Sequence, residues 1–216
     1  MTSFRSVPLI LLVLPAIAAA DFSVGAKVST AGTGIEGYYH FDRQFAFRIG
    51  LGQFTYNDVR DISGINYDYS LTVTGATVLL DIAPRGGNFY VTGGIFVNGN
   101  EFEADAELID TITVGNTTYT AADVGELSGT VTFNPISPYV GLGYRWRAGE
   151  PGLSIGIEGG LLFQGQGDVD LLANGPITDT PGFQQDLVRE TDELEDKLGI
   201  AKVYPVIELR AAYRFR

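Results

Sequence analysis

The clearest pattern in the chain is an alternation of apolar and polar side chains with a period of two. In its last ten residues, "IELRAAYRFR", apolar or aromatic residues alternate with charged ones, and only Ala212 interrupts the charged set. The same period recurs in seven earlier segments, most of which are separated by stretches that contain glycine or proline. Such alternation predicts β-strands with one apolar and one polar face. Eight strands are expected, at about 23–29, 35–41, 45–56, 67–82, 89–100, 127–146, 154–164 and 201–216.

Two of these segments contain irregularities. The alternation changes phase around Gly75, which predicts a bulge in the fourth strand. Pro135 and Pro138 interrupt the sixth segment, so the strand is expected to bend or break there.

The connections alternate between short and long, with the turn at 31–34 as the exception. Short links lie at 42–44, 83–88 and 148–152, and long polar segments at 57–66, 101–126 and 167–200. Short turns at one end and long loops at the other are typical of outer-membrane barrels.

The polar face of the strands carries charges of both signs. In a soluble sandwich these side chains would face water, whereas in a membrane barrel the apolar face meets lipid and the charges point inward. Eight strands leave a lumen that side chains just fill, and charges buried there need partners. We therefore predict an interior charge network of Lys27, Glu36, Arg48, Arg145, Glu158, Glu208, Arg210 and Arg214.

Aromatic residues favour the membrane barrel over the sandwich, because they flank the short turns rather than occupying strand centres. Aromatic girdles of this kind lie at membrane interfaces. The predicted fold is all-β: an eight-stranded antiparallel transmembrane up-and-down β-barrel with one short helix in the last long loop. The flanking aromatics are Tyr39, Phe41, Phe45, Phe47, Phe89, Tyr144, Trp146, Tyr213 and Phe215.

The N-terminus has the organisation of a signal peptide. Arg5 precedes an apolar run over 7–13, and Ala18, Ala19 and Ala20 form a small-residue cleavage site. The run is too short to cross a bilayer of about 30 Å. We predict a signal peptide at 1–20 and a barrel domain at 21–216, exported to the outer membrane of a Gram-negative cell. The chain has no cysteine, so no disulfide stabilises it.

The charge balance bears on possible partners. The net charge is −12, and removing Arg5 with the signal peptide makes it about −13, which disfavours nucleic acid. Acids gather at 101–126 and 167–200. Solvated loops are the favoured interpretation, although divalent cations could bind there and bridge to lipopolysaccharide phosphates. No cofactor or defined metal site is predicted.

The segment 181–198 is predicted to be helical. Thr180 can cap it, Pro181 suits its first turn and Gly199 can end it. Phe183, Leu187, Leu194 and Leu198 form one apolar stripe, which is expected to pack on the barrel mouth or another loop.

His40 is the only histidine. Some eight-stranded barrels are enzymes that modify lipid A with a histidine at the outer leaflet. His40 lies beside the short turn 42–44, at the opposite end, so an interior histidine with a hydrogen bond or a salt bridge is favoured and no catalytic residue is predicted.

The terminal strand carries a family resemblance. "IELRAAYRF" is similar to the closing strand of Gram-negative outer-membrane barrels, which implies that Tyr213 and Phe215 form the signal for the barrel-assembly machinery. Arg216 departs from that pattern by following the aromatic residue. The whole chain resembles small eight-stranded barrels of the OmpA/OmpX type, and more closely a poorly characterised group of proteobacterial outer-membrane proteins. The shared stretches are "GTGIE", "LLDIAP", "NGN", "PYVGLGY", "FQG" and "YPV".

Three functions remain open. The favoured one is a non-enzymatic, monomeric barrel in contact with outer-membrane lipid and lipopolysaccharide, with a structural or surface-interaction role through acidic extracellular loops. The alternatives are a narrow pore for ions or small solutes and a lipid-A-modifying enzyme. A soluble exported sandwich is a further alternative for the fold.

Overall fold

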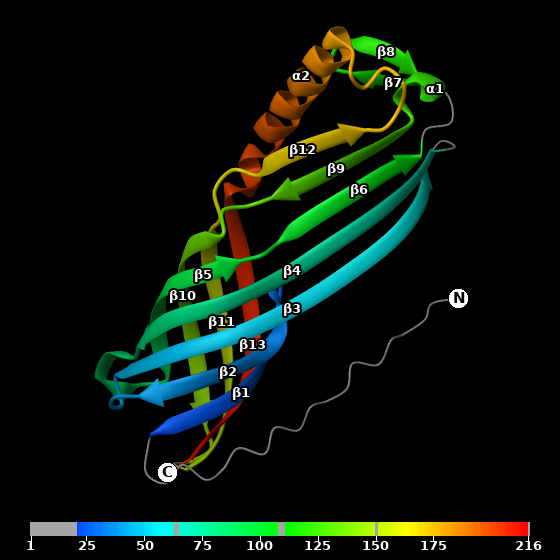
Figure 1. Ribbon diagram of the computed structural model, residues 1–216. Coiled ribbons are helices and arrows are strands. Elements are labelled where there is room, and N and C mark those ends of the chain that lie inside the picture. The colour runs from blue at the N-terminus through cyan, green and yellow to red at the C-terminus, as the bar shows by residue number, and fades with distance from the viewer. Residues whose placement is uncertain (1–20, 63–64, 108–110, 150, 216) are drawn as a thin grey trace.

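A computed structural model describes residues 21–62, 65–107, 111–149 and 151–215; the predicted signal peptide and Arg216 lie outside these residues. Eight antiparallel strands close into a barrel because β4 pairs with β3 on one side and with β5 on the other (Figure 1). The predicted eight-stranded barrel is confirmed. In barrel order the strands are β4 (Ile65–Ile82), β3 (Phe45–Ile62), β2 (Gly32–His40), β1 (Phe22–Ser29), β13 (Val203–Arg214), β11 (Gly152–Phe163), β10 (Ile136–Arg147) and β5 (Phe89–Asn98).

The barrel is apolar outside and charged inside. Exposed and buried residues alternate along β10, where the outward Leu142 is 54% exposed. Inward positions elsewhere hold charges, and Arg48 on β3 has no exposed surface. A chain with this arrangement is stable only where its outer surface meets lipid, and a closed barrel leaves no unpaired backbone edge there. None of the helices in the described part of the chain is long and apolar enough to cross a membrane.

One side of the barrel wall continues beyond the barrel. β3 and β4 have 18 residues each, whereas about 9–11 residues suffice to cross a bilayer. Their outer halves join β6 (Glu101–Glu107), β9 (Glu126–Thr132) and β12 (Asp168–Ala173) in a five-stranded sheet of order β3-β4-β6-β9-β12 (Figure 1). We call this part the projecting sheet.

The projecting sheet keeps the register of the barrel. Asn98 at the end of β5 lies opposite Gly75, and Glu101 at the start of β6 lies opposite Thr72, so β5 and β6 are one interrupted strand. β9 and β10 are related in the same way, and their interruption contains Pro135, as predicted. The break predicted at Pro138 is wrong, because Pro138 lies within β10 opposite Ile95. The bulge predicted at Gly75 is wrong, because β3 and β4 pair without interruption along their whole length.

The prediction of three long loops is largely wrong, because each of these segments contains strand residues. The segment 57–66 is mostly strand, 101–126 contains β6, and 167–200 contains β12. The outward residues of these strands are mostly polar, and those of β6 are acidic, so the alternation with outward apolar residues that marks a barrel strand is missing. The remaining elements there are β7 (Thr111–Val114), β8 (Thr117–Thr120) and α1 (Ala121–Val124), and a short helical turn, η1 (Pro84–Gly86), lies at the opposite end.

The predicted helix is confirmed as α2 (Pro181–Lys197), followed by η2 (Leu198–Lys202). Thr180 is the N-cap residue but makes no capping hydrogen bond, and its hydroxyl donates to the carbonyl of Ile177. The stripe begins with Phe183 and Leu187, which are buried in a small core with Val114 and Val124. The helix therefore packs on the projecting sheet and the β7–β8 hairpin.

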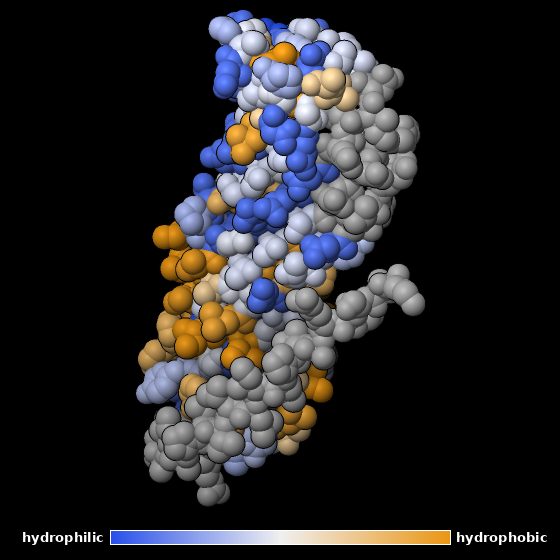
Figure 2. Space-filling model, turned by 45° about the vertical axis from the view of Figure 1, so that its right-hand side comes forward, coloured by the Kyte–Doolittle hydropathy of each residue, from blue (hydrophilic) through white to orange (hydrophobic). Residues whose placement is uncertain are grey.

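The two faces of the wall exchange polarity where it leaves the barrel. On β3 the outward residues change from Ile49 and Leu51 to Thr55 and Asn57, all exposed. On β6 the outward residues are Glu101, Glu103 and Asp105, while Phe102 and Ala104 lie on the face toward α2. Figure 2 shows the apolar surface over the barrel and the hydrophilic surface over the projecting part. The membrane boundary lies at this change, because lipid requires apolar side chains and water does not.

Candidate functional site: the charged lumen

Arg48 lies at the centre of a cluster of buried charges inside the barrel. Its terminal nitrogens lie 3.2 Å from Glu36, 3.1 Å from Asp81, 2.8 Å from Glu158 and 3.4 Å from Glu208. These partners come from β2, β4, β11 and β13, whose inward positions converge because the barrel is narrow. One guanidinium thus connects four strands across the lumen.

Two further cations share the same carboxylates. Lys27 Nζ lies 3.5 Å from Glu36 and 3.4 Å from Glu208. Arg210 forms ion pairs with Glu158 and with Glu208, the second at 2.6 Å. Glu36, Glu158 and Glu208 therefore each contact at least two cations, so the buried charges are mutually compensated.

Tyrosine hydroxyl groups complete the cluster. Tyr139 donates to Glu158 at 2.7 Å and Tyr90 donates to it at 2.8 Å, while Tyr38 donates to Glu36. Tyr139 satisfies the Glu158 oxygen that the cations leave open, whereas Tyr90 adds a bond to the oxygen that Arg48 and Arg210 also contact. Because these two tyrosines come from β10 and β5, their bonds help to fix the rotamer of Glu158 on β11.

Seven of the eight residues proposed for the network are buried in the lumen. Arg145 joins it through Asp81, at 3.1 Å. Arg214 lies at the short-turn end, where it pairs with the exposed Asp21 at 2.9 Å. Sequence reasoning missed Asp81, whose inward position was obscured by the supposed bulge at Gly75, and it left out Tyr90 because only charged side chains were selected. The seven lumen residues are Lys27, Glu36, Arg48, Arg145, Glu158, Glu208 and Arg210.

Inward glycines make room for the large side chains. A methyl group at Gly143 would overlap the ring of Tyr90, and one at Gly75 would overlap the ring of Phe96. Packing against Phe96 thus requires a glycine at position 75, which explains why the alternation of apolar and polar residues is interrupted there.

A second, apolar layer closes the lumen toward the projecting sheet. It consists of buried side chains that pack together, and Tyr204 covers it. Lumenal cavities of about 20 Å³ and 10 Å³ lie at the short-turn end, and one of about 10 Å³ lies between the charges and the apolar layer. Each holds about one water molecule at most, so the lumen is closed in this conformation. The apolar layer comprises Ala31, Leu79, Phe96, Tyr139, Leu162 and Val206.

His40 is buried at the short-turn end of the lumen. Its Nε2 lies 2.8 Å from the hydroxyl of Ser23, on the neighbouring strand β1. His40 lines both cavities at this end, and Arg145 and Arg214 line them as well.

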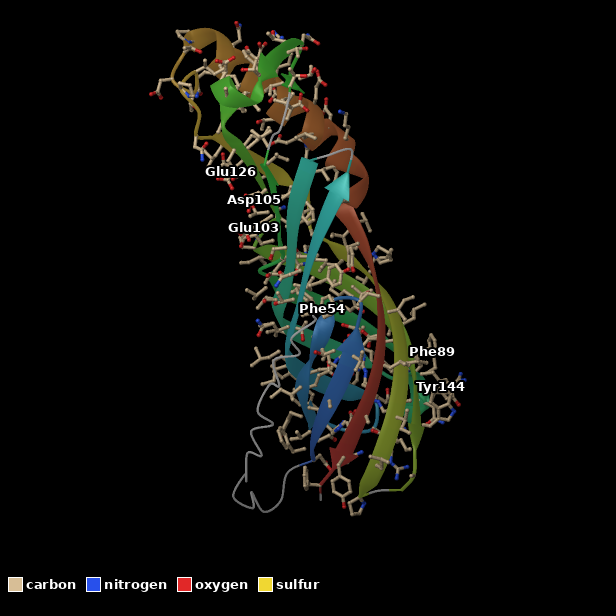
Figure 3. The ribbon with its side chains drawn as sticks, turned by 90° about the vertical axis from the view of Figure 1, so that its right-hand side faces the viewer. Phe54, Phe89, Glu103, Asp105, Glu126 and Tyr144 are labelled. Carbon is tan, nitrogen blue, oxygen red and sulfur yellow. The ribbon has the colours of Figure 1, made fainter. Side chains whose placement is uncertain are left out.

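The predicted aromatic residues surround the outside of the barrel near the short turns. Phe89 and Tyr144 lie on neighbouring strands and point outward (Figure 3). Tyr213 and Phe215 are 47% and 46% exposed and stack edge to face, with ring centroids 5.0 Å apart. All nine residues are exposed, as an interfacial girdle requires.

Acidic residues outside the barrel lie on the outward face of the projecting sheet and on α2. Glu103, Asp105 and Glu126 point away from α2 (Figure 3). No group of three or more histidine, aspartate or glutamate side chains in the described ranges is close enough to hold a metal ion.

The carboxyl group of Asp186, which lies outside the barrel, has a shifted pKa. Hydrogen bonds from Thr117 and Tyr119, followed by the charge of Arg189, lower the pKa of Asp186 below its ordinary value. The Tyr119 hydroxyl donates to Asp186 at 2.8 Å and so attaches α2 to β8.

The apolar exterior, the aromatic girdle and the charged lumen together define an eight-stranded transmembrane β-barrel. Two solved structures share the fold. The chain matches CarO2 of Acinetobacter baumannii with a TM-score of 0.61 and 19% identity, over 91% of this chain and 99% of that one. It matches CarO of the same organism with a TM-score of 0.58 and 19% identity, over 89% and 97% of the two chains. No family model and no curated protein matches the chain.

Proposed function

We propose that the protein is a narrow pore for ions or small solutes in the outer membrane of a Gram-negative bacterium, and that its lumen is closed in the conformation described. The observation that carries this proposal is the set of eight charged side chains that are buried inside the barrel in the described part of the chain, four of each sign. Ion pairs are weak evidence for stability, since apolar residues of similar volume often stabilise as well. Ionisable residues at membrane depth are by default candidates for a pathway.

Each carboxylate buried inside the barrel contacts more than one cation, and this arrangement would allow the ion pairs of the closed lumen to exchange partners. If Arg48 turns away from Glu158, Arg210 still pairs with that carboxylate, and Glu36 still contacts Lys27. No single movement therefore leaves a buried carboxylate without a cation. The water-sized cavities on both sides of the charged layer give its side chains space at either end.

Opening also requires displacement of the apolar layer. Tyr139 belongs to both layers, because its ring packs with Leu79 and Phe96 while its hydroxyl binds Glu158. A change in the ion pairs around Glu158 would thus be transmitted to the apolar layer through one side chain.

A structural or surface-interaction role is the second candidate. It is favoured by the outward acidic face of the projecting sheet, where Glu101, Glu103 and Asp168 are exposed. Divalent cations that bridge these acids to lipopolysaccharide phosphates would serve such a role. Loss of binding to lipopolysaccharide after neutralisation of these three acids would distinguish it from conduction.

We propose no enzymatic role. The Ser23–His40 pair lies at the end with the short turns, which in outer-membrane barrels faces the periplasm, whereas lipid-A chemistry occurs at the outer leaflet. Unchanged lipid-A mass spectra after deletion of the gene are expected.

Export and assembly belong to the same proposal. Residues 1–20 would direct export, and Tyr213 and Phe215 would present the terminal strand to the barrel-assembly machinery. The outward position of both rings is consistent with that role.

Conductance in planar bilayers tests the pore. Arg48→Ala removes a charge and leaves space, whereas Arg48→Met removes the same charge but largely fills the space. We expect small, reproducible conductance for the wild type, a marked increase for Arg48→Ala and a smaller one for Arg48→Met. Heat-dependent gel migration verifies that each variant is folded, and Arg85→Ala on the exposed turn is the control. Folded wild-type and Arg48→Ala proteins that both leave the bilayer non-conducting would contradict the proposal.

A further inference from the structure

A pocket of about 400 Å³ lies outside the barrel, between the projecting sheet and the end of α2. This volume is within the range of small-molecule sites, and it is far larger than the lumenal cavities. Its floor is formed by β6, β9 and β12, and Leu194, Lys197 and Leu198 form the opposite wall. All lining residues except Lys197 are apolar: Phe102, Ala104, Ile112, Leu127, Gly129, Val131, Val169, Leu171, Leu194 and Leu198.

The pocket arises because α2 packs closely at its beginning and separates from the sheet toward its end. Phe183 and Leu187 are buried, with 1% and 8% of their surface exposed. Leu194 and Leu198, on the same stripe, line the pocket instead. Ala104 contributes to the floor on β6, and because its side chain is small it does not reach the helix.

Hydrogen bonds hold the helix at this distance. The backbone N–H of Gly115 donates to Glu190 at 2.9 Å, and that of Val169 donates to Glu195 at 3.3 Å. These two hydrogen bonds lie on either side of the apolar stripe and hold α2 in position. The helix therefore does not close onto the floor, and the apolar lining gains contacts only when another molecule fills the space.

Lys197 determines which molecule suits the pocket. Among the described residues it is the one charged residue in the lining, and no carboxylate lies at ion-pair distance from it, although α2 is rich in acids. An apolar pocket with a single unpaired ammonium group complements an alkyl chain that ends in one negative charge.

We propose that this pocket binds a fatty acid, with the alkyl chain between α2 and the sheet and the carboxylate at Lys197. This site is separate from the lumen, so it does not depend on conduction. A neutral or cationic amphiphile would gain the same apolar contacts but would lack the ammonium partner. Lipopolysaccharide acyl chains are the other occupants to be distinguished.

The test is equilibrium binding of labelled decanoate to the full chain in lipid nanodiscs, with protein-free nanodiscs subtracted. Saturable binding at one site per chain is expected. Octanoate should bind roughly tenfold more weakly, because it buries two fewer methylene groups. Lys197→Gln should weaken decanoate binding about two- to fivefold, as expected for an exposed ion pair.

A matched pair of variants locates the site. Ala104→Trp fills the pocket and should abolish saturable binding. Glu103→Trp places the same side chain on the opposite face of β6 and should leave binding unchanged. Heat-dependent gel migration verifies folding of both variants.

Three results would overturn the proposal: no saturable binding above the protein-free nanodiscs, binding that survives Ala104→Trp, or equally tight binding of decanol or decyltrimethylammonium. Displacement of decanoate by purified lipopolysaccharide at lower concentration than by decanoate itself would assign the pocket to acyl chains of the membrane and would also overturn it.

Discussion

Glu158 is the residue whose replacement should disturb the lumen most informatively. Its carboxylate accepts hydrogen bonds from Tyr139 at 2.7 Å, Tyr90 at 2.8 Å and Arg48 at 2.8 Å, and it forms an ion pair with Arg210. Glu158→Gln retains the shape but removes the charge and places an amide donor where an oxygen accepted.

The loss of stability expected for Glu158→Gln can be estimated from these contacts. Arg48 and Arg210 both retain Glu36 and Glu208, so neither becomes an unpaired buried charge. The main loss is in hydrogen bonds to a charged acceptor, each worth about 1.5–3 kcal/mol. We expect the free energy of unfolding to fall by about 2–4 kcal/mol.

A double-mutant cycle with Tyr139→Phe isolates one bond. Because the hydroxyl of Tyr139 donates to Glu158, the two substitutions should couple by about 1.5–3 kcal/mol. Urea titration in lipid vesicles, with the folded fraction measured from heat-dependent gel migration, gives the four unfolding free energies. The same cycle with the exposed Arg85→Ala should give no coupling. A coupling of Tyr139 to Glu158 below about 0.5 kcal/mol would refute the arrangement of the lumen described above.

Two further predictions concern packing and pH. Gly143→Ala should destabilise the barrel by about 1–3 kcal/mol, because the added methyl group overlaps an inward tyrosine ring. Gly159→Ala should be neutral, because its added carbon has no neighbouring atom within 4 Å. Urea titration of both variants measures these two changes in stability. The hydrogen bonds from Thr117 and Tyr119 that lower the pKa of Asp186 stabilise the attachment of α2 above the unfolded pKa of about 3.9, and this stabilisation is lost as the pH falls through the lower folded pKa. The protection factor of α2 amides in hydrogen exchange should therefore be constant from pH 7 to 5 and decrease below about pH 4, and Asp186→Asn should remove that decrease.

The sequence predicted the barrel because a period of two is visible wherever one face meets lipid. The alternation of Tyr39 and Phe41 with His40, for example, is the same in the chain and in the structure. The acidic strands were missed because their outward side chains meet water. In β6 the outward Glu103 has Phe102 and Ala104 as neighbours, which resembles a polar loop when the sheet around it is unknown.

The sequence predicted most of the charged residues that line the lumen, but not which of them form ion pairs with one another. Arg48 and Glu158 are 110 residues apart, and their contact depends on the tilt and stagger of strands that a sequence does not state. The pocket under α2 was also beyond prediction, since it depends on where the helix separates from the sheet rather than on which residues form its stripe.

The exchange of polarity along β3 is the central claim, and lipid quenching tests it most directly. The chain contains no cysteine, so Ile49→Cys and Asn57→Cys each give one labelling site on the outward face. With an environment-sensitive fluorophore in lipid vesicles, we predict that the label at 49 is quenched by spin-labelled lipid and not by aqueous iodide, and that the label at 57 shows the reverse. Iodide quenching at position 49 without lipid quenching would place the apolar face in water and contradict the membrane barrel.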